Sequence, residues 1–258
     1  MPKAPLDEIL MTTKRRVASL RNRARELERQ AAAAPPPRPF AAALAGTTVG
    51  VIAEVKRRSP SAGTIRDDLD PVAHAQAYAR GGAVAVSVLT DEAHFGGSLE
   101  DLARVAREVP VPVLRKDFIL DELQLFEARA AGASAVLLIA RALDADRLGT
   151  LARAAQGCGL ATLVEAHTEA ELDRALAVAP TAVGVNSRDL SSYDVDLRVA
   201  ERLLARIPRA VPAVAESGIE TRGDVERLAA AGADLVLVGT SVARTADPAA
   251  AVRALCGV

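Results

Sequence analysis

The chain of 258 residues is poor in cysteine and histidine, with two of the first and three of the second. Cys158 and Cys256 lie far apart and form no Cys-x-x-Cys pair, and neither has a metal-ligand spacing to His74, His94 or His167. We therefore expect reduced thiols of minor structural importance, as is usual for intracellular chains, and no metal site.

An excess of charge of either sign is also missing, because 32 basic residues stand against 33 acidic ones and the formal net charge is −1. This balance argues against a broad surface for nucleic acid or an acidic membrane, although it leaves room for a local anion site. No apolar run approaches the roughly 20 residues of a membrane span, and residues 1–30 are too charged for a signal peptide. We therefore expect a cytoplasmic protein.

Hydrophobic residues, by contrast, make up 50% of the chain, which excludes a disordered protein and suits one large α/β domain or two small ones. From about Phe40 onward the chain repeats one pattern, a short β-branched apolar run followed by a turn and a helical segment rich in Ala, Leu and Arg. The runs recur every roughly 20 to 34 residues, the period of a strand plus a helix. They are residues 49–55, 83–89, 111–116, 134–140, 160–166, 181–186, 211–217 and 234–239.

Several helical segments end in a glycine just before the next strand, within residues 80–83, 130–134 and 230–234. Glycine is common at this position because it ends a helix in a left-handed conformation. Eight such units in about 250 residues are the dimensions of a (β/α)8 TIM barrel, which we predict for residues 40–258. A doubly wound sheet is the alternative, disfavoured because no G-x-G-x-x-G follows the first strand.

An N-terminal extension precedes the predicted barrel. Apolar residues fall at helical spacings between many charged ones over residues 6–30, and a proline-rich stretch at 34–39 then interrupts helix formation. We expect residues 1–39 to be a helical extension with a linker, joined to the barrel in a single domain. The helix either packs beside the barrel or closes over a binding site as a lid.

Polar groups end five of the predicted strands, and in barrels of this class the chemistry lies at that end. They are Glu54 and Lys56, Lys116, Glu165, Asn186 with Arg188, and Glu216 with Ser217. Taken singly, Glu54 and Lys56 could form a structural ion pair and Asn186 could cap a turn. Together they predict one pocket in which lysines and carboxylates act as general acids and bases.

Small residues follow the last two strands, at Ser217 and Gly218 and again at Gly239, Thr240 and Ser241. Barrel enzymes commonly bind a substrate phosphate at these two loops, on backbone N–H groups at the start of a short extra helix. We therefore expect a phosphorylated substrate.

Six segments that carry these residues resemble, in order, the indole-3-glycerol phosphate synthases, the decarboxylating ring-closing enzymes of tryptophan biosynthesis. The segments are IAEVKRRSPSAG at 52–63, SVLTDEAHFGGSLEDL at 87–102, PVLRKDFI at 112–119, LVEAHTEAEL at 163–172, VGVNSRDL at 183–190 and AESGIETRGDVERL at 215–228. The resemblance extends from about Leu6 over essentially the whole chain. It implies conversion of 1-(2-carboxyphenylamino)-1-deoxyribulose 5-phosphate to indole-3-glycerol phosphate, without a metal, an organic cofactor or an obligatory protein partner.

The resemblance also implies residue roles. Lys116 is implied as the general acid at the substrate ketone, helped by Glu54, and Glu165 as the main base or proton carrier. Lys56 is implied to assist dehydration and to contact the substrate. The remaining implied positions are Asn186 and Glu216 for orienting the substrate, Arg188 and Lys56 for its carboxylate, Ser59, Ser217, Gly218, Gly239 and Thr240 for the phosphate, and Phe95 and Phe118 for the aromatic ring.

The chain departs from the family pattern at His94, Gly96 and Thr240. We expect these differences to alter the shape of the pocket and to leave the reaction unchanged. We expect His94 to be a surface loop residue. Two other functions remain as alternatives: another phosphate-binding barrel of the same pathway, such as phosphoribosylanthranilate isomerase or the tryptophan synthase α subunit, or a non-catalytic barrel subunit. Lys116 and Glu165 favour the synthase, because ring-opening isomerisation generally uses a Cys or Asp pair at the strand ends.

Overall fold

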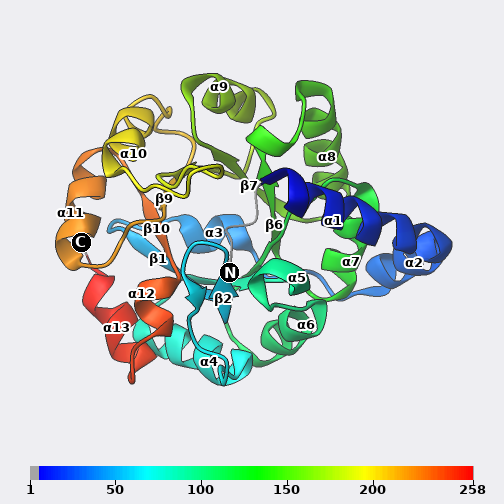
Figure 1. Ribbon diagram of the computed structural model, residues 1–258, viewed down its shortest axis with the longest axis horizontal. Helices are drawn as coiled ribbons and strands as arrows, with labels where there is room; N and C mark the ends of the chain where they lie inside the picture. The colour runs from blue at the N-terminus through cyan, green and yellow to red at the C-terminus, as the bar shows by residue number, and fades with distance from the viewer. Residues whose placement is uncertain (1–5, 258) are drawn as a thin grey trace.

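A computed structural model describes residues 6–257 and contains a closed barrel of eight parallel strands ringed by helices (Figure 1). The barrel strands are β1 (Gly50–Val55), β4 (Ala85–Leu89), β5 (Val113–Lys116), β6 (Ala135–Ile139), β7 (Ala161–Ala166), β8 (Ala182–Asn186), β9 (Ala213–Glu216) and β10 (Leu235–Val238). Each strand pairs with the next in sequence, and β10 closes the ring on β1. The predicted (β/α)8 barrel is confirmed, with a strand in each of the eight apolar runs.

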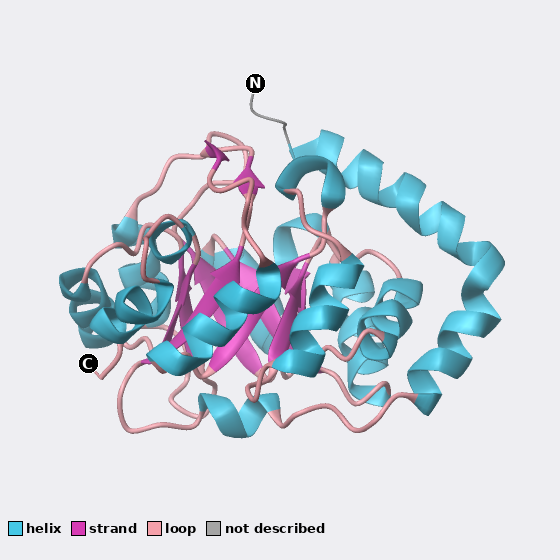
Figure 2. Cartoon of the chain, turned by 90° about the horizontal axis from the view of Figure 1, so that it is seen from below, coloured by secondary structure: helices cyan, strands magenta, loops and turns pink. Residues whose placement is uncertain are grey.

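The loop after β1 contains a small hairpin that the sequence analysis did not anticipate. Two short strands, β2 (Arg58–Ser59) and β3 (Gly63–Thr64), pair as an antiparallel hairpin. The hairpin stands at the carboxyl end of the barrel (Figure 2).

Helices surround the barrel and follow the predicted alternation with the strands. They are α4 (Pro71–Gly81), α5 (Glu92–Phe95), α6 (Leu99–Glu108), α7 (Glu122–Ala130), η2 (Ala140–Ala142), α8 (Ala145–Gly157), α9 (Glu169–Ala177), α10 (Leu197–Leu204), α11 (Arg222–Ala230), α12 (Thr240–Ala243) and α13 (Pro248–Leu255). The expected glycines at helix ends are left-handed, with φ of 102° at Gly82, 87° at Gly132 and 108° at Gly232. Within residues 6–257 no helix is long and apolar enough to cross a membrane.

Alternation along the strands divides the core into two layers. Val51 and Ala53 belong to the layer between strands and helices, whereas Ile52 points into the barrel with Leu114 and Leu163. A short helix, α3 (Phe40–Leu44), adds Phe40 and Leu44 to the inner layer. The barrel interior is therefore a packed core, and polar groups can gather only at its rim.

The N-terminal extension is helical as predicted but is broken in the middle. A 3₁₀ turn, η1 (Arg21–Arg23), separates α1 (Leu6–Leu20) from α2 (Ala24–Ala33), and residues 34–39 are extended. α1 lies at the carboxyl end of the barrel, on the same side as the hairpin, whereas α2 packs on α7 (Figures 1 and 2). The extension thus reaches the end of the barrel where the polar groups were predicted.

Candidate active site

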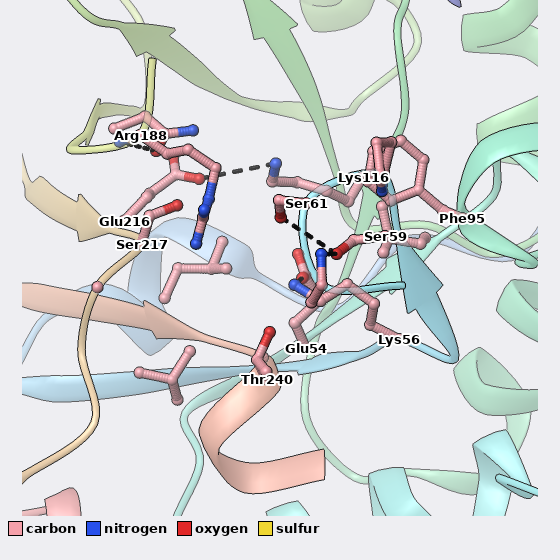
Figure 3. Close-up of a pocket in the computed structure, with 18 of the residues that line it drawn as sticks. Glu54, Lys56, Ser59, Ser61, Phe95, Lys116, Arg188, Glu216, Ser217 and Thr240 are labelled. Atoms are coloured by element: carbon pink, nitrogen blue, oxygen red, sulfur yellow. Dashed lines mark hydrogen bonds and ion pairs between the residues drawn. The ribbon is translucent and has the colours of Figure 1, made fainter. Parts of the chain in front are cut away.

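A cavity of about 440 Å³ opens at the carboxyl ends of the strands. Every residue that the sequence nominated lines it: Glu54, Lys56, Ser59, Phe95, Lys116, Phe118, Glu165, Asn186, Arg188, Glu216, Ser217, Gly218, Gly239 and Thr240. Figure 3 shows side chains from β1, β5, β9 and the start of α12 pointing toward this common space. The geometry brings these residues together, while their individual roles remain proposals.

Lys116 lies between two carboxylates. Its Nζ is 3.4 Å from Glu165 Oε2 and 3.7 Å from Glu216 Oε2. Burial would lower the pKa of this ammonium, but the negative charges of Glu165 and Glu54 raise it above its ordinary value. Lys116 is therefore protonated at neutral pH and available as a proton donor.

The two carboxylates beside Lys116 have opposite pKa shifts. Burial opposes ionisation of Glu165, but Lys116, His167 and a hydrogen bond from Asn186 bring its pKa below the usual value. Burial and the neighbouring charge of Glu165 raise the pKa of Glu216 well above its usual value. Such a separation gives one base and one group that keeps its proton.

A glycine makes the position of Glu216 feasible. A Cβ at Gly184, in the middle of β8, would come within 2.2 Å of Glu216 Oε1. A side chain at this position would displace the Glu216 carboxylate, which explains the glycine inside the VGVN strand.

Glu54 and Lys56 form the ion pair that was one interpretation of their spacing, with Lys56 Nζ 2.7 Å from Glu54 Oε1. Burial would raise the pKa of Glu54, but Lys56 and Lys116 lower it. A Cβ at Gly239 would come within 2.8 Å of Lys56 Nζ. Lys56 is thus both the counter-ion of Glu54 and a cation beside the start of α12.

The anion end of the cavity is built from two loops. Ser217 and Gly218 are consecutive left-handed residues with φ of 67° and 74°, and a Cβ at Gly218 would come within 2.5 Å of Val195 Cγ1. Thr240 begins α12, the short extra helix expected after the last strand (Figure 3). Ser241 contributes to structure instead, because its hydroxyl donates to the Ile219 carbonyl at 3.0 Å.

Phe95 and Phe118 form the aromatic end of the cavity, with ring centroids 6.4 Å apart. Arg188 donates to the Tyr193 carbonyl at 3.0 Å, and burial lowers the pKa of its guanidinium. The expectation that His94 is a surface loop residue is wrong. It lies in α5 with its side chain only 10% exposed and Nδ1 3.2 Å from Asp91.

The sequence did not nominate the apolar wall of the cavity. This wall includes Leu89, Ile139 and Leu237, the last inward-pointing residues of β4, β6 and β10, together with Leu137, the inward-pointing residue before Ile139. Alternation along each strand was a usable signal, since a residue two positions from a core residue faces the same way. Arg244 also lines the cavity and had no comparable signal.

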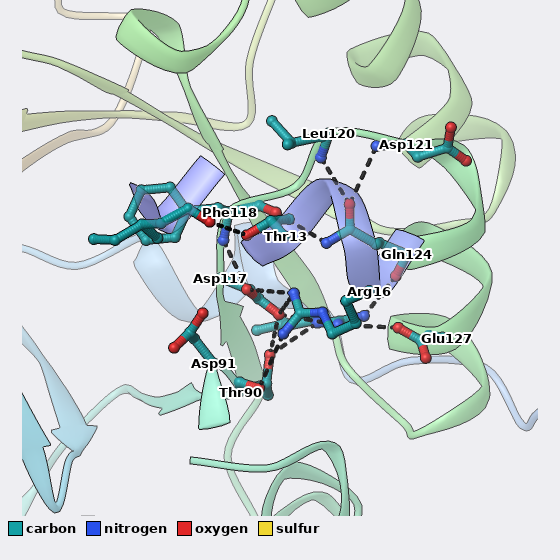
Figure 4. A network of polar contacts seen from close by, with 12 residues as sticks. Thr13, Arg16, Thr90, Asp91, Asp117, Phe118, Leu120, Asp121, Gln124 and Glu127 are labelled. Atoms are coloured by element: carbon teal, nitrogen blue, oxygen red, sulfur yellow. Dashed lines mark hydrogen bonds and ion pairs between the residues drawn. The ribbon is translucent and has the colours of Figure 1, made fainter. Parts of the chain in front are cut away.

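A polar network ties α1 to the strand end that carries Lys116 (Figure 4). Both oxygens of Asp117 accept from the Arg16 Nη2 at 2.8 Å. Asp117 also accepts from Thr90 at 2.6 Å and from Arg115 at 3.0 Å. Asp117, the residue after Lys116, is therefore held by side chains from α1, from β5 and from the residue that follows β4.

The fold and the site together define a (β/α)8-barrel enzyme whose cavity, at the carboxyl end of the barrel, is lined by lysines and carboxylates. Within that class the chain belongs to the indole-3-glycerol phosphate synthase family, whose model matches residues 6–255. Its activity is accordingly that of a decarboxylating lyase, which forms indole-3-glycerol phosphate in tryptophan biosynthesis.

Curated relatives agree with the family model. The chain is 48% identical over 232 residues to indole-3-glycerol phosphate synthase 2 of Streptomyces coelicolor, covering 90% of each chain. It is also 48% identical over 227 residues to the indole-3-glycerol phosphate synthase of Mycobacterium tuberculosis, covering 88% of this chain and 84% of the relative.

Solved structures support the fold alone. A 3-hexulose-6-phosphate synthase superimposes with a TM-score of 0.64 at 18% identity, covering 80% of this chain and 98% of that one. A thiamine phosphate pyrophosphorylase from Pyrococcus furiosus gives 0.60 at 17% identity, covering 80% and 93%.

Proposed function

We propose that Lys116 is the general acid and Glu165 the base of the ring-closing reaction. The observation that carries this assignment is the ammonium of Lys116 held at the cavity wall, 3.4 Å from Glu165 and 3.7 Å from Glu216. A donor that stays protonated next to an ionised acceptor provides both proton transfers in one place.

The first task is to fold a flexible substrate. Its phosphate binds the loops at Ser217–Gly218 and Gly239–Thr240, with the hydroxyl of Ser59 nearby, and its aromatic ring packs against Phe95 and Phe118. Arg188 and Lys56 provide positive charge for the carboxylate. Holding both ends brings the ring carbon to the ketone carbon, and such orientation accounts for much of the rate of intramolecular reactions.

Ring closure and decarboxylation follow. As the ring carbon bonds to the ketone carbon, the carbonyl electron pair moves to oxygen, which takes a proton from Lys116. The carboxylate then leaves as carbon dioxide, and its bonding electrons restore the aromatic ring. Glu54 supports this step through its negative charge, which helps to keep Lys116 protonated.

Dehydration completes the reaction. Glu165 removes a proton from carbon, the electron pair of that bond forms the new double bond, and the C–O bond breaks. The leaving hydroxide takes a proton from Lys56 and departs as water. Asn186 and Glu216 orient the substrate hydroxyls from the ends of β8 and β9.

We also propose that residues 1–39 and 40–258 act as a single domain, and that the protein works in the cytoplasm on a small phosphorylated substrate. None of the steps above needs a cofactor, a metal, a nucleic acid, a membrane or a second protein.

The assignment of the two lysines is tested by following indole absorbance and carbon dioxide release together. Lys116→Met should lose both products, with kcat lowered about 10³-fold or more and KM changed only a few-fold. Lys56→Met should release carbon dioxide faster than indole forms, because it is impaired at dehydration. Near-normal turnover by Lys116→Met would show that the acid is another residue.

A further inference from the structure

His167 has no place in the steps above, although it lies next to one of their participants. It directly follows β7 and comes two residues after Glu165, so both side chains project to the same side of the chain. Its side chain is 3% exposed, and it is not among the described residues that line the cavity. It therefore lies behind Glu165 and can act on the substrate only through that carboxylate.

The outer side of the imidazole is held by Glu171, on α9. Glu171 Oε2 accepts from the His167 backbone N–H at 2.8 Å and lies 3.2 Å from His167 Nδ1. Its other oxygen accepts from Arg141 at 3.1 Å, and Arg141 also pairs with Asp189 at 2.9 Å. Burial would raise the pKa of Glu171, but the hydrogen bonds from His167 and Arg141 lower it to about 2.

These contacts fix the tautomer of His167. An ionised carboxylate can only accept hydrogen bonds, so the Nδ1 that faces Glu171 carries a proton. In the neutral ring Nε2 is then the bare nitrogen. This is the arrangement by which a carboxylate orients a histidine and stabilises its cation.

The inner side of the imidazole faces the base. His167 Nε2 is 3.4 Å from Glu165 Oε1, and both side chains are almost completely buried. Among residues 6–257, neither of these two atoms has a hydrogen-bond partner. Two buried polar atoms left without partners are unfavourable, so a proton taken up by either atom would be favoured there.

Glu165 therefore has two differently engaged oxygens. Oε1 faces His167, whereas Oε2 faces Lys116 at 3.4 Å. The charged and titratable groups around His167 are Glu165 on β7, Glu171 on α9, Arg141 on η2 with Asp189 behind it, and Lys116 and Glu216 beyond Glu165.

We propose that His167 is a positioning residue that holds the proton Glu165 removes from the substrate and returns it to Lys116. The inference rests on the proposed role of Glu165 as the base. The carbon–hydrogen bond breaks and its proton binds Glu165, then moves from Oε1 to Nε2, leaving an imidazolium beside ionised Glu171. After the product leaves, the proton returns to Glu165 Oε1, and rotation of this carboxyl group carries it to the Lys116 amine, which had lost one to the ketone oxygen.

On this route every proton that the two lysines lose is replaced within one turnover. Lys116 gives one proton to the ketone oxygen and regains the one that came from carbon. Lys56 gives one to the leaving hydroxide and regains it from solvent. One proton is thus consumed per turnover, which matches the conversion of a carboxylate to neutral carbon dioxide.

The first test is spectroscopic and does not depend on turnover. The chain has only three histidines, so ¹⁵N-histidine labelling gives three imidazoles, and His167→Asn assigns one of them by its loss. We expect a protonated Nδ1 at His167 and a change at its Nε2 in Glu165→Gln. A bare Nδ1, or an Nε2 signal indifferent to Glu165→Gln, would overturn the inference.

The second test is kinetic. In His167→Asn the asparagine keeps a donor toward Glu171 but has no atom at the position of Nε2. We expect kcat to fall about 10- to 100-fold and KM to stay within about twofold of that of the unchanged protein. The double variant with Glu165→Gln should be no slower than Glu165→Gln alone, because His167 acts only through Glu165. A further loss in the double variant would indicate a separate structural role and contradict the proposal.

Control variants distinguish the role of His167 from the proposed role of Glu165 as the base. His74→Gln alters a histidine of α4 that does not line the cavity and should leave kcat unchanged. If His167→Asn folds poorly, Glu171→Gln serves instead and should also lower kcat and change the imidazole spectrum. Normal turnover by Glu165→Gln would reject the assigned base, whereas a slow Glu165→Gln with a fully active His167→Asn would reject only the role of His167.

Discussion

At the residue scale, Glu216 is a carboxyl group in an environment that disfavours its charge. Its side chain is 2% exposed, and burial and the charge of Glu165 raise its pKa well above 4.5. The folded protein therefore keeps this proton to higher pH than the unfolded chain does. Stability falls as pH rises between the unfolded and folded pKa values, since the native state binds more protons there.

Glu216→Gln should accordingly stabilise the protein, and increasingly so at higher pH. Glutamine has nearly the same shape and needs no ionisation, so the melting temperature of the variant minus that of the natural protein should grow from about pH 4.5 upward. Turnover should fall at the same time, because Glu216 orients the substrate. Thermal melts at several pH values measure this, and a difference that shrinks with rising pH would show that the carboxyl is not destabilised.

At the element scale, Arg16 makes a polar connection between α1 and the catalytic rim. The Arg16 guanidinium donates to both carboxylate oxygens of Asp117, which directly follows Lys116. The side chain of Asp117 is completely buried, whereas that of Arg16 is 29% exposed. Asp117 keeps Arg115 and Thr90 when Arg16 is removed, so its charge is not left alone.

Arg16→Met should therefore cost about 1–2 kcal/mol of stability, less than the loss of a fully buried pair. For a chain of this size that corresponds to about 2–8 °C in melting temperature. Amide exchange should accelerate in α1, and kcat should fall a few-fold because Lys116 is less firmly placed. Arg15→Met, at an exposed neighbouring position of α1, is the matched control, and equal effects of the two changes would exclude a specific link.

The same elements show how far the sequence alone could lead. The eight strands and the polar residues at their ends follow from local patterns, because each segment by itself shows its apolar run and the polar residue that ends it. The 3.4 Å approach of Glu165 to Lys116 is not local, since these residues come from β7 and β5 and meet only through the stagger of the closed barrel. The break at Arg21–Arg23 also escaped prediction, because it follows from docking α1 on the rim and α2 on α7.

At the scale of the whole molecule, the extension and the barrel share one core. Ile9 of α1 and Phe40 of α3 belong to the same buried cluster as Ile52 and Leu237 of the barrel strands. The linker is fixed by Arg129, which donates to the Ala34 carbonyl at 2.9 Å. Short helices such as α1 and α2 are marginal by themselves in water, so their stability depends on these contacts.

We therefore expect the extension to unfold together with the barrel. Burial of Ile9, Val17, Leu20 and Leu27 stabilises the docked helices by up to about 1.5–3 kcal/mol per side chain, which is large beside the usual stability of a domain. Hydrogen exchange in increasing urea measures this, comparing peptides from residues 6–33 with peptides from β6 and β7. Coincident loss of protection indicates one cooperative unit. Loss of protection in residues 6–33 at clearly lower urea would make the extension a separable element, and a lid that opens independently of the barrel would then become the better description.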